Sequence, residues 1–98
     1  MRGTVFFPAR HPDLAEVVRL DTPANARKAA KKLERMFNQA SRSRKLTILR
    51  AINLAAIRAR IGSQNKRLSE KERREYKVIH GIYRRLYEKL SKKYKGGD

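Results

Sequence analysis

The sequence predicts a mainly α-helical fold: a compact three-helix domain preceded by a short N-terminal β segment. Two observations support this prediction. Apolar residues recur at helical spacing in three stretches, and residues that cap or interrupt helices separate these stretches. Residues 1–21 contain instead two short runs that are rich in β-branched and aromatic side chains. A chain of 98 residues is long enough for one small domain with a thin core.

The N-terminal segment, residues 1–21, is expected to be extended. Thr4–Phe7 and Glu16–Leu20 are its two candidate strands, and Pro8 and Pro12 interrupt the stretch between them. The two strands could form a loose hairpin, or one of them could pair with another chain as an intermolecular ribbon. Because an isolated two-stranded ribbon is only marginally stable, either arrangement has to pack on the rest of the protein.

A basic three-helix domain is predicted over residues 22–95, followed by a flexible tail at residues 96–98. Its helices are expected at about residues 23–40, 43–61 and 70–94. Thr22 is placed to cap the first helix, and Gly62 favours the end of the second. Ser69 opens the third helix with a capping box, in which Glu72 is the reciprocal partner.

The second predicted helix is the most apolar element. Of the 16 residues from Leu46 to Ile61, 11 are Ala, Leu or Ile, which is more than one face of a helical wheel. We therefore expect it to be the central helix, covered on two sides. Asn53 interrupts its apolar pattern; a buried polar residue that sets the helix register is the favoured interpretation, and a contact to adenine is the alternative.

The charge is strongly one-sided. The chain contains 26 Lys and Arg against 9 Asp and Glu, a formal net charge of +17, and residues 22–98 carry all of it. No acidic residue occurs between Glu34 and Glu70. A solvated helix normally mixes both signs, and thermophile surfaces enrich both, whereas one-sided positive charge is typical of proteins that bind nucleic-acid phosphates.

We therefore predict a small, non-enzymatic, basic nucleic-acid-binding protein that holds double-stranded DNA largely through phosphate contacts. Its expected role is in a nucleoid, a virion or gene regulation, within the cytoplasm. The cluster at residues 41–45 lies at a helix N-terminus, where backbone N–H groups and hydroxyls also favour a phosphate. The candidate contacts are Arg27, Lys28, Lys31, Arg35, Arg42, Ser43, Arg44, Lys45, Arg50, Arg58, Lys66 and Arg67.

Two other functions stay open. An RNA-binding component of a ribonucleoprotein, such as a ribosomal accessory protein, would have the same short basic chain and lysine-rich end. A structural or oligomerisation module would use the N-terminal segment or the apolar second helix as the interface of a homodimer. Competition between DNA and RNA separates the first from the lead prediction, and light scattering separates the second.

Catalytic and metal chemistry find no support in the sequence. There is no glycine-rich phosphate loop, no nucleophile elbow and no zincin motif, so no catalytic residue or cofactor is predicted. Without cysteine, a disulfide framework and cysteine-ligated zinc are excluded, and no metal site is predicted. No apolar run approaches the roughly 20 residues that span a bilayer, and no membrane partner is expected.

Four tyrosines form a stripe on the third predicted helix. At 100° per residue they fall within about 40° of one another, on the face that also carries Ile79, Leu86 and Leu90. We expect this stripe to be core, and a stacking surface for single-stranded bases is the alternative. Its members are Tyr76, Tyr83, Tyr87 and Tyr94. His80 lies near the same face and is expected to be a packed or rim histidine.

Part of the chain resembles ribbon-helix-helix DNA-binding proteins. Glu16–Leu20, followed by Thr22–Pro23 and the first helix, resembles the ribbon and first helix of that family, and Ser41–Arg42–Ser43 resembles the start of its second helix. The resemblance covers about 45 residues. It implies a dimer whose paired strands enter the major groove, with Arg19 reading bases and Ser41 and Ser43 holding phosphate.

Overall fold

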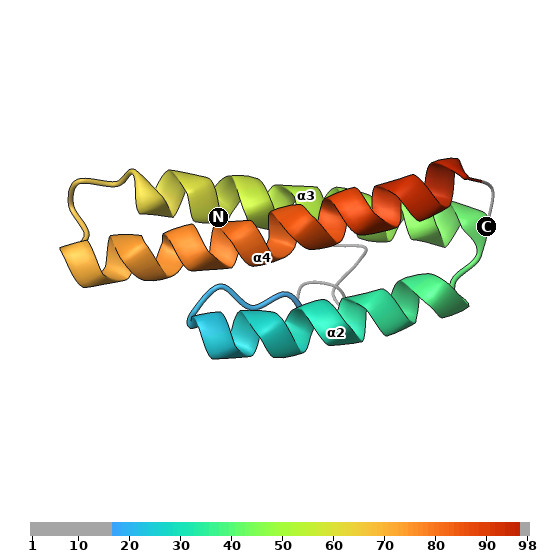
Figure 1. Cartoon of the computed structure of the whole chain (residues 1–98), viewed down its shortest axis with the longest axis horizontal. Helices are drawn as coiled ribbons and strands as arrows, with labels where there is room; N and C mark the ends of the chain where they lie inside the picture. Colours follow the sequence, from blue (N-terminus) through green and yellow to red (C-terminus); the bar gives the residue numbers. More distant parts are fainter. Residues whose placement is uncertain (1–16, 97–98) are drawn as a thin grey trace, which may run out of the picture.

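The computed structural model describes residues 17–96, and three helices lie side by side within them (Figure 1). They are α2 (Pro23–Gln39), α3 (Arg42–Ser63) and α4 (Glu70–Lys95). Each begins and ends within two residues of its predicted bounds, so the mainly α-helical class is confirmed. α2 and α4 run in the same direction and α3 runs against both, because the connections at residues 40–41 and 64–69 are short.

The predicted N-terminal caps of α2 and α4 form as expected, and α3 also has a serine as its N-cap. The side-chain oxygen of Thr22 accepts a hydrogen bond from the Asn25 amide at 3.1 Å, and Ser41 caps α3 through its own side chain. At α4, the Ser69 hydroxyl accepts from the Glu72 amide, and the Glu72 carboxylate accepts from the Ser69 amide at 3.0 Å. This backbone hydrogen bond to the charged form lowers the pKa of Glu72 below its ordinary value.

The central helix is α4, so the prediction that α3 occupies this position is wrong. α4 packs against both neighbours, whereas α2 and α3 contact each other little. α3 buries one broad side, and three of its large aliphatic residues stay exposed on the other: Leu54, Ile57 and Ile61. Asn53 is only half-buried, so it is not the buried register-setting residue that the sequence suggested.

The predicted strand at residues 16–20 is not found in residues 17–20. Val17 is helical, and Val18–Leu20 has no regular secondary structure. Val18 nevertheless enters the core, where only 7% of its surface is exposed. Thr4–Phe7 and the rest of residues 1–16 lie outside the described residues, as do Gly97 and Asp98 of the predicted tail.

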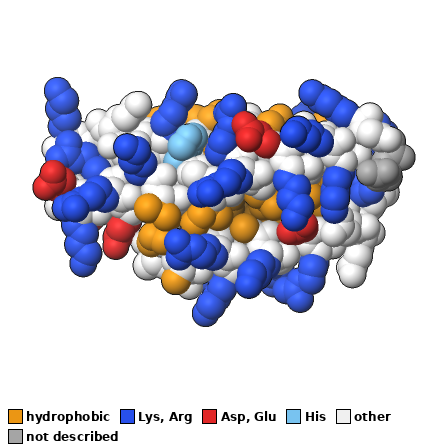
Figure 2. All heavy atoms as spheres, in the orientation of Figure 1, with side chains coloured by type: hydrophobic (Ala, Val, Ile, Leu, Met, Phe, Trp, Pro, Cys, Tyr) orange, Lys and Arg blue, Asp and Glu red, His pale blue; other side chains and the backbone are white. Residues whose placement is uncertain are grey.

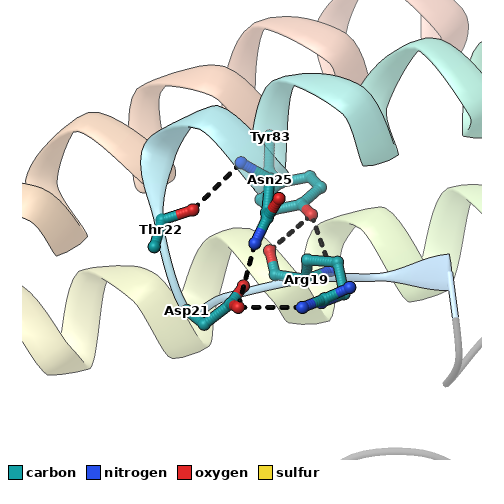
Figure 3. Close-up of polar contacts among 5 residues, drawn as sticks. All are labelled: Arg19, Asp21, Thr22, Asn25 and Tyr83. Atoms are coloured by element: carbon teal, nitrogen blue, oxygen red, sulfur yellow. Dashed lines mark hydrogen bonds and ion pairs between the residues drawn. The ribbon is translucent and has the colours of Figure 1, made fainter.

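Tyr83 supplies the hydrogen bonds that a neighbouring strand would give to this segment (Figure 3). Its hydroxyl accepts from the Arg19 amide at 3.0 Å and donates to the Arg19 carbonyl at 2.7 Å. The Asp21 carboxylate accepts from the Arg19 guanidinium at 2.8 Å and from the Asn25 side-chain amide at 3.0 Å. The segment before α2 is therefore attached to α4 through Tyr83, and Asp21 links it to the start of α2.

The tyrosine stripe is part of the core. Tyr83 is fully buried, and the other three tyrosines are half-buried and pack against the core cluster. His80 is half-buried, and its Nδ1 lies 2.9 Å from the Ala56 carbonyl of α3. It is a packed histidine that joins α3 to α4, as expected from the sequence.

Gly62 does not end α3, although the sequence suggested that it would. The helix continues to Ser63 and is capped at Gln64. A Cβ atom at Gly62 would lie 2.7 Å from the Tyr76 ring, so this glycine allows the close approach of α3 to α4. At Gly81 of α4, the nearest atom to such a Cβ is the flexible end of Arg85, at 3.3 Å.

The two glycines predict opposite effects of the same substitution. Gly62→Ala is expected to lower the free energy of unfolding by about 1–3 kcal/mol, because the Tyr76 ring must move out of packed surroundings. Gly81→Ala is expected to raise it by up to about 1 kcal/mol through helix propensity. Urea denaturation measures both. Equal gains in the two variants would contradict the close contact at Gly62.

Candidate nucleic-acid interface

Four predicted contacts lie on α2, and all are exposed. Arg27, Lys31 and Arg35 recur every four residues along one side of the helix, and Lys28 lies next to Arg27. The buried residues of α2 occupy the opposite side. We call these four cations the α2 ridge. Its charge points away from the core because the helix repeat separates the two sides.

Two cations of the predicted cluster at the start of α3 contact aromatic rings. Arg42 is exposed, and its guanidinium lies 4.2 Å from the centre of the Tyr94 ring. The ammonium of Lys45 lies 5.3 Å from the centre of the Phe37 ring. Each contact crosses between helices, so both cations have a defined direction before any ligand binds.

The serines of this cluster are engaged in the helix cap. The Ser41 hydroxyl accepts from the Arg44 amide at 3.3 Å, and its oxygen lies 3.4 Å from the Ser43 hydroxyl oxygen. Ser41 and Ser43 are both exposed. The hydroxyls therefore stabilise the helix start, and the exposed Arg42 gives this end of the molecule outward-facing charge.

The structure adds cations from α4 that were not among the predicted contacts. The end of α4 lies beside the start of α3 and the end of α2 (Figure 1). There the Lys93 ammonium donates to the Asn38 side-chain oxygen at 3.4 Å. The short connection between α3 and α4 predicts an antiparallel pair, and in such a pair the end of α4 lies beside the start of α3. The basic pole, as we name it, consists of Arg42, Arg44 and Lys45 of α3 with Lys92, Lys93 and Lys95 of α4.

The remaining predicted contacts lie elsewhere. Arg50 and Arg58 are exposed along α3, and Lys66 and Arg67 are exposed in the loop at its far end. The 22 residues of α3 span about 33 Å at 1.5 Å per residue, so this loop is far from the basic pole. The twelve predicted residues therefore do not form one patch. On the face in Figure 2, Lys and Arg surround a band of hydrophobic side chains between α4 and α2.

Acidic partners are concentrated outside α3. Ion pairs join Lys89 to Glu34 at 2.7 Å, Arg84 to Glu88 at 3.0 Å and Arg74 to Glu70 at 3.7 Å. α3 itself contains no acidic residue from position 42 to position 63. Positive charge is therefore partly offset along α4 and is not offset from within α3.

Among residues 17–96, no group of three side chains is arranged to hold a metal ion. Within the described range, none of the helices has the length and apolar character needed to cross a membrane.

Comparisons with known proteins do not assign a function to this chain. No family model, curated protein or solved structure matches the chain. The ribbon-helix-helix resemblance also loses its strand over residues 17–20, and the Arg19 side chain pairs with Asp21. The position of the exposed charge is therefore the observation that bears on function.

Proposed function

We propose that this protein binds double-stranded DNA without catalysis, mainly through phosphate contacts from the α2 ridge and the basic pole. The main support is the combination of an exposed row of cations on α2 with an acid-free α3 that follows it directly. Such an arrangement attracts a polyanion whatever its base sequence. A role in a nucleoid or virion, and homodimer formation, remain predictions.

The two cationic groups are joined through a short connection. α2 ends at Gln39 and α3 begins at Arg42, so the ridge leads along α2 towards the pole. The aromatic contacts of Arg42 and Lys45 restrict these side chains before binding, which lowers the entropy cost of placing them on phosphates. Each neutralised phosphate of B-DNA contributes about 0.9 to the dependence of log K on log salt concentration.

A matched pair of variants tests the α2 ridge. Arg27→Gln/Arg35→Gln removes two exposed cations from the ridge. Arg74→Gln/Arg84→Gln removes two exposed cations of α4 that pair with Glu70 and Glu88. The net charge changes equally in both. We expect the ridge variant to lower the salt slope for duplex DNA by about 2 and the α4 variant to leave it nearly unchanged.

Fluorescence anisotropy at several salt concentrations measures both slopes, and circular dichroism checks that both variants fold. Equal losses in the two variants would mean that only net charge matters and would reject contacts by the ridge. Stronger binding of folded RNA in competition would favour a ribonucleoprotein component. A preference for single strands is not expected, because Tyr83 is fully buried and the other stripe tyrosines pack on the core.

A further inference from the structure

An apolar stripe runs along the outer side of α3. Leu54, Ile57 and Ile61 are 37%, 38% and 55% exposed, although α3 buries seven other apolar residues. They follow one another at spacings of three and four residues, so they project from one side of the helix on successive turns. Their exposed surfaces adjoin one another, so they form one small apolar patch and not three scattered residues.

The stripe has the spacing of one heptad of a coiled-coil seam, which the exposed Arg50 precedes at the previous d position. With Leu54 at position a, Ile57 is at d and Ile61 is at the next a, while Arg58 and Arg60 are at e and g. Both arginines are exposed. Side chains at e and g flank the partner helix in such pairs and choose it by charge. The apolar stripe does not depend on the proposed DNA binding, since none of its three aliphatic residues contacts phosphate in that proposal.

The charge of α3 decides what this stripe can accept. A second copy would bring Arg58 and Arg60 against the same cations, with no acidic residue on either helix to offset them. We therefore propose that the stripe docks an acidic amphipathic helix of a partner protein, with aliphatic residues at a and d and Glu or Asp at e and g. The partner's aliphatic side chains cover the stripe, and its carboxylates pair with Arg60 and its neighbours.

A synthetic helical peptide of about three heptads, with Leu at a and d and Glu at e and g, is the probe. We expect the full chain to bind it at least about tenfold more tightly than the same peptide with Lys at e and g. Ile57→Gln is expected to weaken binding at least about tenfold. The matched control is Val78→Gln on α4, because Val78 is similarly exposed, at 42%, and should leave affinity unchanged.

A charge exchange makes the test specific. Arg60→Glu should weaken binding of the Glu peptide and strengthen binding of the Lys peptide. The proposal is overturned if a scrambled peptide of the same composition binds as well as the Glu peptide, or if Ile57→Gln has no effect. It is also overturned if light scattering shows a dimer that Ile57→Gln converts to a monomer. The ridge variant should keep full peptide binding, which separates this proposal from DNA binding.

Discussion

Replacing Phe37 with alanine is expected to lower the free energy of unfolding by about 3–5 kcal/mol. Phe37 is 1% exposed and lies near the end of α2, where its ring also meets the Lys45 ammonium of α3. Its removal leaves a cavity at the junction of these helices, and the surrounding side chains fill such a cavity only partly. A domain of this size has about 5–15 kcal/mol in total, so the variant should lose a large fraction of its stability.

Urea denaturation followed by circular dichroism measures the loss. Met36→Ala is the control, because Met36 is the neighbouring residue and is only half-buried. It should cost clearly less than Phe37→Ala. Similar losses in the two variants would contradict the burial of Phe37. The junction also positions the α2 ridge beside the basic pole. Where most of the Phe37→Ala protein has unfolded, this arrangement is lost and the affinity for DNA should fall.

Replacing Tyr83 with phenylalanine is expected to cost about 2 kcal/mol at neutral pH. The ring would still fill its place in the core, but the amide and carbonyl of Arg19 would lose the hydroxyl that satisfies both. Partly buried backbone groups without partners are costly, because folding has removed their water. Tyr87→Phe is the control, since Tyr87 is half-buried. A loss equal to that of Tyr87→Phe would contradict the contact to Arg19.

The same hydroxyl makes stability depend on pH. Burial raises the pKa of Tyr83 from 10.0 to about 12. The unfolded chain therefore loses this proton first, and the stabilisation is complete below pH 10 and is lost as pH rises towards 12. Lysines also titrate in this range, so the measured quantity is the stability difference between the wild type and Tyr83→Phe, which should shrink and disappear.

The helices could be predicted because their signals are local. Thr22, Ser41 and Ser69 lie next to the apolar patterns they cap, and a cap needs only backbone groups within three residues. Which helix lies in the centre of the bundle could not be predicted in this way. A helical wheel shows that α3 is more apolar than one face requires, but it does not show whether a neighbour covers Leu54 or Ile57.

The segment before α2 shows a different limit. Val17 and Val18 have the β-branched side chains typical of strands, and that pattern led to the strand prediction. The backbone of Arg19 is satisfied by Tyr83, which lies 64 residues away in the sequence. A hydrogen bond of this kind has no counterpart in the local pattern, so only the folded chain reveals it.

For the candidate interface, the exposure of the cations could be predicted from the sequence, but their grouping in space could be predicted only in part. Exposure of the α2 ridge follows from helix periodicity, and the structure agrees. Lys66 and Arg67 were grouped with Arg42 because they share an acid-free stretch, yet α3 separates them by its full length. The predicted contacts do not include the lysines near Tyr94, although the antiparallel order of α3 and α4 brings Tyr94 itself into contact with Arg42.

The 64-residue separation between Arg19 and Tyr83 also orders the events of folding. α3 and α4 are consecutive in the chain and share the larger part of the interhelical contacts, so they can meet after closing only a short loop. The contact to Arg19 closes a much longer loop, and it adds little to the stability of the partly folded chain until Tyr83 is in place. We therefore expect the α3–α4 hairpin to form first and the segment before α2 to dock last.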